Sequence, residues 1–196
     1  MTHSKLILAS TSTIRQLLLS NAGLAFTCQS SSVDEDEYKS KHDSLKPEEL
    51  ALTLADLKAK SINAPNAIVI GADQTLSCNG RLFNKAKTLI EAKSCLQSLR
   101  GQTHTLHSAI SISQSGRTLF STVDSAHLKM RNFSDEFLED YLKTCGPEIL
   151  TSVGCYQFEQ QGAQLFDRIE GDYFTILGFP LLSCLAFLRQ MKFLKT

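Results

Sequence analysis

A single carboxylate, Asp73, follows a short apolar run at residues 67–70 that is ended by Gly71. The next charged residue along the chain is Arg81, so Asp73 stands alone. Residues at the carboxyl end of a strand in an α/β sheet tend to face the ligand crevice. A carboxylate there can bind a divalent metal or act as a general base. From the residue alone, an aspartate that only caps a turn has comparable weight.

Three basic residues, Arg15, Lys58 and Lys85, could supply the positive charge that a triphosphate needs. Lys85 comes after an Asn79-Gly80 pair, which is the strongest short signal for a β-hairpin. A hairpin would turn the chain back between Asp73 and Lys85. Each lysine could equally be a surface side chain whose stem packs on apolar neighbours.

The segment LASTSTIR places two serines where a predicted strand ends and a predicted helix begins. Backbone N–H groups at a helix start form an anion site, and Ser10, Ser12 and Arg15 could add donors to a phosphate. On these residues alone, a serine cap and a solvated arginine are the preferred interpretation.

Two acidic features complete the candidate chemistry. The run VDEDE offers Asp34 and Glu35 as metal ligands, although a charge run is usually solvated. Glu159 is a lone acid near glycines and indicates little by itself.

His104 and His107 are three residues apart on a predicted strand. Because side chains alternate along a strand, the two histidines are predicted to point to opposite faces, which disfavours a metal site made by the pair.

The elements that must position these residues alternate early in the chain and pair later. Helices are predicted where capping signals and periodicity agree, and strands where apolar runs end at turn residues. The acidic stretch at residues 31–44 is predicted to be a loop. Predicted strands are 5–10, 24–29, 67–70, 104–113 and 117–130, with a hairpin at 76–83; predicted helices are 11–23, 47–63, 88–101, 134–147 and one from Pro180. This order predicts an α/β fold with a mixed sheet in a single domain spanning residues 1–196.

Composition excludes several function classes. The 196-residue chain has 20 Lys plus Arg and 20 Asp plus Glu, which argues against a nucleic-acid polymer or a membrane surface as partner. No apolar run reaches the roughly 18–20 residues of a membrane span, and the N-terminus lacks signal-peptide architecture. Six cysteines without a CxxC pair predict reduced core residues of a cytoplasmic protein.

Several segments, in this order across almost the whole chain, resemble the Maf family of nucleoside triphosphate pyrophosphatases. They are LILASTSTIRQLLL, VDE, LADLKA, IGADQT, NKA, LRGQTH and SVGCYQFEQQGAQLFDRIEGDYFTILGFPLL. The resemblance implies cleavage of a nucleoside triphosphate to the monophosphate and pyrophosphate with a divalent cation such as Mg, Mn or Co. It also implies an elongated mixed sheet flanked by helices, two lobes around a central active-site cleft, and a possible homodimer.

The same resemblance implies roles for individual residues. It assigns phosphate binding to Ser10, Ser12 and Arg15, catalytic roles to Asp73, Lys58, Lys85 and Glu35, and metal binding to Asp73 and Glu35. The sequence departs from the family pattern at Thr13-Ile14, where the family usually has Pro-Arg, and at Asn84-Lys85-Ala86, where it has Gly-Lys-Pro.

The choice of base is assigned, again by resemblance, to Ile14, Gln74 and Glu159. Gln74 and Glu159 resemble the branch that acts on 7-methyl-GTP, whose ring carries a positive charge that a carboxylate would favour. Tyr156 is similar to the dTTP and UTP branch, which stays an alternative. A weakly catalytic, nucleotide-binding regulator of septum formation is the other alternative.

Overall fold

The computed structural model describes residues 5–195, and these divide into two compact units. Unit 1 comprises residues up to Gln74, residues 107–124 and residues from Tyr173 onward. Unit 2 comprises residues 75–106 and 125–172. The strands β3 (Ala67–Cys78), β5 (Thr103–Gln114) and β6 (Arg117–Met130) each contribute residues to both units. No helix in residues 5–195 is long and apolar enough to cross a membrane.

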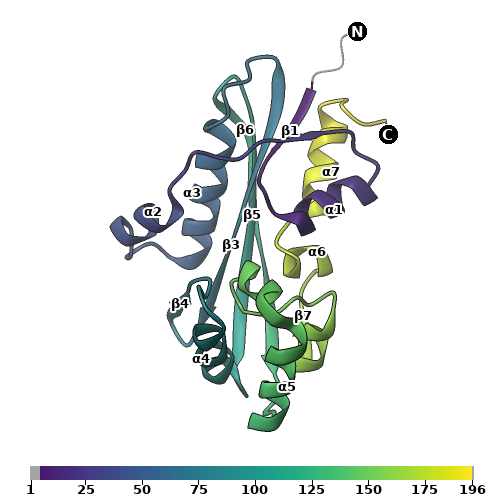
Figure 1. The fold of residues 1–196 in the computed structure, drawn as a ribbon. Coiled ribbons are helices and arrows are strands. Elements are labelled where there is room, and N and C mark those ends of the chain that lie inside the picture. Colours follow the sequence, from purple (N-terminus) through teal and green to yellow (C-terminus); the bar gives the residue numbers. More distant parts are fainter. Residues whose placement is uncertain (1–4, 196) are drawn as a thin grey trace. The chain divides into compact units, whose positions relative to one another are not determined.

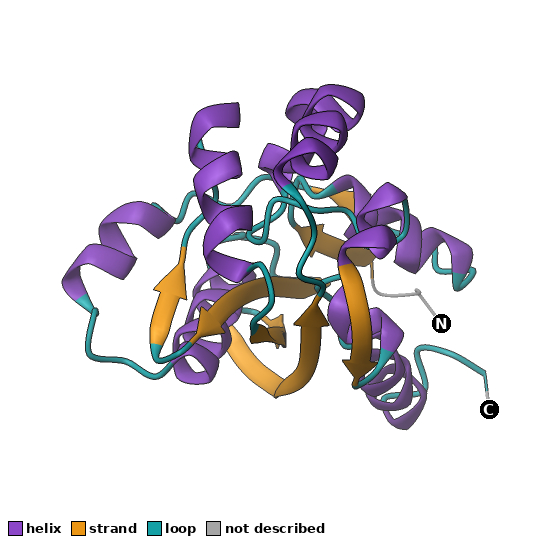
Figure 2. Ribbon diagram, turned by 90° about the horizontal axis from the view of Figure 1, so that it is seen from below, coloured by secondary structure: helices purple, strands orange, loops and turns teal. Residues whose placement is uncertain are grey.

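The strands form one mixed sheet, with helices flanking them (Figure 2), which confirms the predicted fold class. Hydrogen-bonded neighbours follow the order β2-β1-β3-β5-β6-β7, and β4 (Arg81–Phe83) pairs with β3. β1 (Lys5–Ala9) is parallel to β2 (Thr27–Cys28) and to β3, whereas β4 runs antiparallel to β3 and β7 (Phe166–Glu170) antiparallel to β6.

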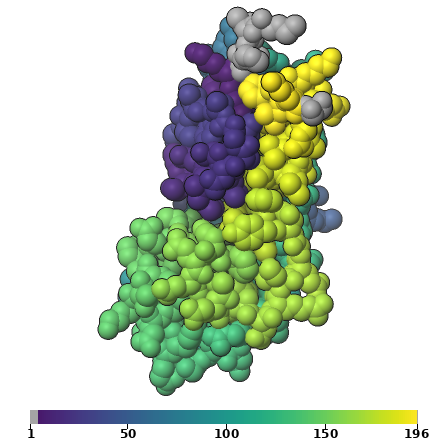
Figure 3. Space-filling model, turned by 90° about the vertical axis from the view of Figure 1, so that its right-hand side faces the viewer, coloured from purple at the N-terminus to yellow at the C-terminus, as the bar shows by residue number. Residues whose placement is uncertain are grey.

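Unit 1 contains five of the helices in the part of the chain that the structure describes. They are α1 (Thr13–Asn21), α2 (Glu35–Lys41), α3 (Pro47–Lys60), α6 (Tyr173–Ile176) and α7 (Leu181–Gln190). Figures 1 and 3 both place α7, near the C-terminus, beside α1, near the N-terminus. The predicted helices at 11–23, 47–63 and from Pro180 are confirmed, with Pro47 in the first turn of α3 as expected for proline.

Unit 2 contains α4 (Leu89–Leu99), α5 (Asp135–Cys145) and two short 3₁₀ helices, Gly146–Thr151 and Gln161–Leu165. The side chains of Thr88 and Ser134 accept hydrogen bonds from Glu91 N and Phe137 N, as their capping signals predict. Asn79 and Gly80 both have positive φ between β3 and β4, so the predicted hairpin is confirmed.

Three local predictions are wrong. The segment at 31–44 is not a continuous loop, because Asp34 caps α2 by accepting from Glu37 N at 2.9 Å and Glu-to-Lys pairs four residues apart support the helix. The strand predicted to stop at residue 70 continues to Cys78, so Asp73 lies within β3 rather than at its end. The strand predicted at 24–29 is reduced to Thr27–Cys28.

The cysteines carry free thiols, but they are not all core residues. Cys78, Cys155 and Cys184 are buried, whereas Cys28 is exposed. The exposure of Cys28 follows from its position on β2, which is a two-residue strand at the edge of the sheet.

His104 is a buried histidine of unit 2, and a hydrogen-bonding contact inside the protein accounts for its burial. Its side chain is 1% exposed, and Nε2 lies 2.7 Å from the hydroxyl of Tyr156. Burial lowers the pKa of His104 from its ordinary value of 6.5 to about 4. Between these two values the unfolded chain binds more protons than the folded protein, so acidification favours unfolding.

We expect the free energy of unfolding to fall by up to about 3 kcal/mol as pH decreases from 6.5 to 4 through this histidine. The variant His104→Gln should flatten that slope, measured by urea denaturation at a series of pH values. His127→Gln, at an exposed histidine of the same unit, is the control and should keep the slope. An equal slope in wild type and His104→Gln would contradict the assignment.

Candidate active site

The centre of the candidate site in unit 1 is the ammonium of Lys58, which lies between two carboxylates. Its Nζ is 2.6 Å from Asp73 Oδ1 and 2.7 Å from Glu35 Oε1. Lys58 is 6% exposed and Asp73 is 3% exposed, whereas Glu35 is partly open to solvent. The structure therefore brings together three residues that are far apart in the sequence, each of which the sequence analysis singled out.

A close approach between α3 and β3 makes this contact possible. Gly71 packs against the helix so tightly that a Cβ there would overlap Ala55 O and Ala59 N. Lys58 lies on the same turn of α3 as Ala59, and Asp73 lies two residues after Gly71 on the same face of β3. Glu35 reaches Lys58 from the first turn of α2.

Arg15, in the first turn of α1, is held by backbone carbonyls. Its Nε donates to Gly178 O and its Nη1 donates to Ala72 O, both at 2.9 Å. Burial lowers the pKa of the guanidinium, and the negative charges of Asp73 and Glu35 oppose that shift. The guanidinium is thus a fixed positive charge within the electrostatic field of the two carboxylates.

The serines of the N-terminal motif lie at the start of α1. Ser12 is the N-cap residue without a side-chain capping bond, and its backbone N–H donates to Ser10 Oγ at 3.2 Å. Ser10 is buried, and Ile14 is half-buried in the first turn of the helix. The structure thus places Ser10, Ser12 and Arg15 around one helix N-terminus, as predicted.

Gln74 follows Asp73 and therefore lies on the opposite face of β3. Its Nε2 donates to Ser108 Oγ at 2.9 Å, to Ile176 O at 3.1 Å and to Thr175 O at 3.2 Å. The carboxamide is therefore held in one place. The sequence predicted Gln74 only as a residue that affects base choice.

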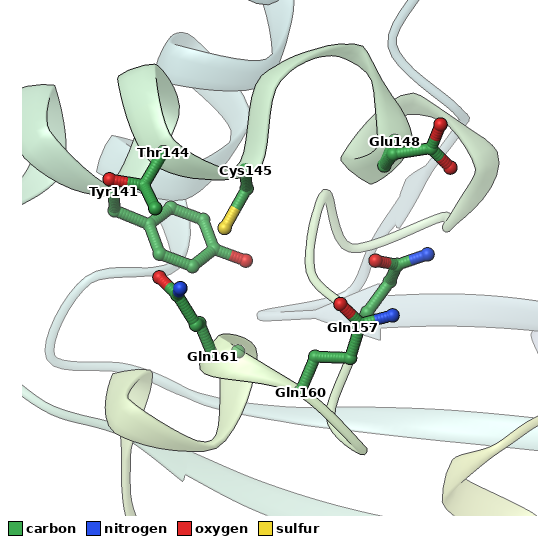
Figure 4. A pocket seen from close by; sticks show the side chains of 8 residues that line it. Tyr141, Thr144, Cys145, Glu148, Gln157, Gln160 and Gln161 are labelled. Carbon is green, nitrogen blue, oxygen red and sulfur yellow. The ribbon is translucent and has the colours of Figure 1, made fainter.

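Lys85 and Glu159 belong to unit 2, and both are exposed there. Lys85 follows β4 by two residues, and Glu159 precedes the 3₁₀ helix Gln161–Leu165. Unit 2 also has a cavity of about 220 Å³, shown in Figure 4, where the hydroxyl of Tyr141 faces glutamine side chains. Neither Lys85 nor Glu159 lines that cavity.

The donor set around Lys58 fits a divalent cation that takes few protein ligands. Among residues 5–195, no group of three or more His, Cys, Asp or Glu residues is placed to hold a metal. Asp73 Oδ2 is buried and has no hydrogen-bond partner in the described part of the chain. Mg²⁺ typically uses one or two carboxylates and completes its shell with water and substrate phosphates. Asp73 and Glu35 match that pattern.

The groups that hold Arg15 and Gln74 were not predicted from the sequence. Four of the five acceptors are backbone carbonyls, of Ala72, Thr175, Ile176 and Gly178, and a carbonyl leaves no signal in residue type. The fifth is Ser108, one of several serines on a predicted strand. The only available signal was the segment FTILG, which the resemblance included without giving it a role.

Comparison with known proteins gives matches over nearly the whole chain. The family described as "Maf-like protein" matches residues 5–191. A "Nucleoside triphosphate pyrophosphatase" of Caulobacter vibrioides is 48% identical over 96% of each chain. A "7-methyl-GTP pyrophosphatase" of Bartonella henselae is 44% identical over 95% of this chain and 96% of that protein.

We expect Gly71→Ala to destabilise unit 1 and to lower any activity that depends on Lys58, because the added methyl group separates α3 from β3. Overpacking of this kind typically costs about 1–3 kcal/mol. Urea denaturation and turnover measure the two effects. Gly23→Ala is the control, since it adds strain at positive φ but has no atom within 4 Å of the new methyl group. Wild-type stability and activity in Gly71→Ala would contradict this packing.

Proposed function

Because the chain belongs to the family of Maf-like proteins, we infer that it is a nucleoside triphosphate pyrophosphatase. Such a hydrolase cleaves the α–β phosphoanhydride bond of a nucleoside triphosphate and releases the monophosphate and pyrophosphate. Relatives named for this activity match about 95% of the chain at 44–48% identity. The observation on this chain that best supports the proposal is the Asp73–Lys58–Glu35 cluster, in which Asp73 and Lys58 are buried and one oxygen, Asp73 Oδ2, is unpaired.

In the proposed reaction, a water molecule attacks the α-phosphorus and pyrophosphate departs. Asp73 Oδ1 is engaged by Lys58, so Oδ2 is the oxygen that orients the water or accepts its proton. Lys58 and Arg15 stabilise the negative charge that develops on the phosphates. Positioning and electrostatic stabilisation carry most of the catalysis in phosphoryl transfer, and these residues supply both.

We propose that Asp73 and Glu35 hold a divalent cation, such as Mg, Mn or Co, together with the substrate phosphates. When bound, such a cation neutralises phosphate charge and favours attack at phosphorus. Two carboxylates beside Lys58 and Arg15 sum to no net charge, so the bare cluster does not balance a polyanionic substrate. Lys85, from unit 2, is proposed as a further phosphate ligand, and Ser10 and Ser12 as donors to the phosphates.

The proposed substrate is a modified nucleotide such as 7-methyl-GTP. Support comes from Glu159, whose carboxylate would favour a cationic base, and from relatives named "7-methyl-GTP pyrophosphatase" at 43–44% identity. Ile14 and Gln74 are proposed to contribute to base choice. A single domain with two lobes around a cleft, a cytoplasmic location and a homodimer stay predictions.

Asp73→Asn should abolish pyrophosphate release, because an amide neither accepts the proton of water nor holds a cation as a carboxylate does. The measurement is pyrophosphate released from a panel of nucleotides with Mg²⁺ or Mn²⁺, alongside circular dichroism to verify folding. Glu37→Gln, which removes an exposed carboxylate paired with Lys41, is the control and should retain activity. Near-normal turnover by folded Asp73→Asn would refute the role of Asp73.

Glu159→Gln should change base choice more than rate, because the neutral amide no longer attracts a cationic ring. We expect the ratio of kcat/KM for 7-methyl-GTP to that for UTP to fall by a factor corresponding to about 1–3 kcal/mol. Glu139→Gln, at an exposed acid of the same unit, serves as the control. An unchanged ratio with a uniformly lower rate would mean that Glu159 serves the chemistry instead.

A further inference from the structure

We propose that Ser108 is a positioning residue, which locks the carboxamide of Gln74 so that only its carbonyl oxygen can meet the substrate. The substrate group opposite Gln74 must then be a hydrogen-bond donor. This inference rests on the proposed function, since it concerns how the same site selects its nucleotide.

The Gln74 carboxamide has a single orientation that its neighbours allow. One end of it lies within 2.9–3.2 Å of three oxygens, which belong to Ser108, Thr175 and Ile176. Thr175 O and Ile176 O are backbone carbonyls and can only accept. An amide nitrogen offers two hydrogens to such acceptors, whereas an amide oxygen in the same place would be repelled.

The hydroxyl of Ser108 is able to donate as well as to accept, so the partner of its hydrogen matters. Ser108 is 0% exposed, and its Oγ donates to Thr175 O at 2.7 Å. Its single hydrogen is therefore committed, and its oxygen can only accept from Gln74. All three neighbours of this end of Gln74 are acceptors, so the flipped carboxamide, with oxygen and nitrogen exchanged, is excluded.

The carbonyl oxygen of Gln74 lies close to Gly178. Gln74 Oε1 and Arg15 Nη2 are each 3.5 Å from the position that a Cβ on Gly178 would take. The oxygen and the guanidinium that is proposed to bind phosphate therefore border the same position at Gly178, and the oxygen is at the opposite end of the carboxamide from the nitrogen that donates to Ser108. A nucleotide held by Arg15 would meet Oε1 and not Nε2.

The same turn supports both side chains. Gly178 O accepts from Arg15, while Thr175 O and Ile176 O accept from Gln74. The segment FTILG, residues 174–178, therefore has a role, because its carbonyls hold both the guanidinium of Arg15 and the carboxamide of Gln74. Gly178 has a φ of 88°, which favours glycine at the end of this turn.

An acceptor fixed in this way selects nucleotides that carry a donor opposite it. Two groups have that chemistry, the imino N–H of guanine or uracil and the 2′-hydroxyl of ribose. A site built to bond such a group rejects an analogue that lacks it, because the acceptor, which is covered by the bound nucleotide, is then left unpaired.

The experiment compares Gln74→Ala, Ser108→Ala and the double variant with wild type. The control is Ser113→Ala, which deletes an equally buried hydroxyl of β5 that donates instead to Ala59 O. Initial rates give kcat/KM for GTP, 2′-deoxy-GTP and 1-methyl-GTP, and for UTP, dUTP and 3-methyl-UTP. The deoxy nucleotides report on the ribose hydroxyl and the methylated bases on the imino N–H.

We expect Gln74→Ala to reduce one of these two discrimination ratios by about tenfold, and Ser108→Ala to reduce the same ratio by about threefold or more. Ser113→Ala should leave both ratios unchanged. The double variant should discriminate no better or worse than Gln74→Ala, because Ser108 acts through Gln74. Equal loss of rate for every nucleotide in Ser108→Ala, or additive effects in the double variant, would overturn the proposal.

A readout that needs no turnover separates this inference from the proposed function. In an NMR spectrum, the side-chain amide protons of Gln74 should be protected from solvent exchange in wild type and in Ser113→Ala. In Ser108→Ala they should exchange about tenfold faster or more, since one of three acceptors is lost. Absence of pyrophosphate release by wild type would refute the proposed function. Unprotected side-chain amide protons of Gln74 in wild type would instead refute the proposal that Ser108 fixes this carboxamide.

Discussion

The buried ammonium of Lys58 is the constraint on which much of unit 1 depends. Lys58 is only 6% exposed, and removing an ammonium from water costs several kcal/mol. Ion pairs at good geometry are needed to offset that cost. The pairs with Asp73 and Glu35 meet that condition, and they require two other features. Gly71 must lack a side chain so that α3 can approach β3, and α2 must form so that Glu35 reaches back to Lys58.

Strand β3 separates two networks by the alternation of its side chains. Asp73 faces α3 and the charged cluster, whereas Gln74 faces Ser108 and the backbone carbonyls of Thr175 and Ile176 in α6. Arg15 connects the two, because it binds the backbone of β3 at Ala72 O and lies in the field of both carboxylates. Neighbouring residues of one strand can therefore serve charge stabilisation and hydrogen-bond selection separately.

The sequence predicted the features that depend on local signals. The Asn79-Gly80 hairpin and the helix capped by Ser134 rest on residues within a few positions of each other, and both are confirmed. Helix α2 was missed because a charge run appears solvated until the pairing of Glu35 with Lys58, twenty-three residues later, is known. The length of β3 was missed because Gly71, which weakens a strand in isolation, is required there by packing against α3.

The charges of the site also explain how a chain with no net charge could bind a polyanion. The charges of Lys58 and Arg15 balance those of Asp73 and Glu35, so the cluster has no surplus of positive charge. An anionic ligand then needs positive charge from outside the cluster, which the proposed divalent cation would provide. Because Asp73 Oδ2 is buried without a partner in residues 5–195, the cost of that unsatisfied oxygen falls when a cation or water binds to it. The folded protein thus retains an unsatisfied group at the one atom where the proposed chemistry needs a strong acceptor.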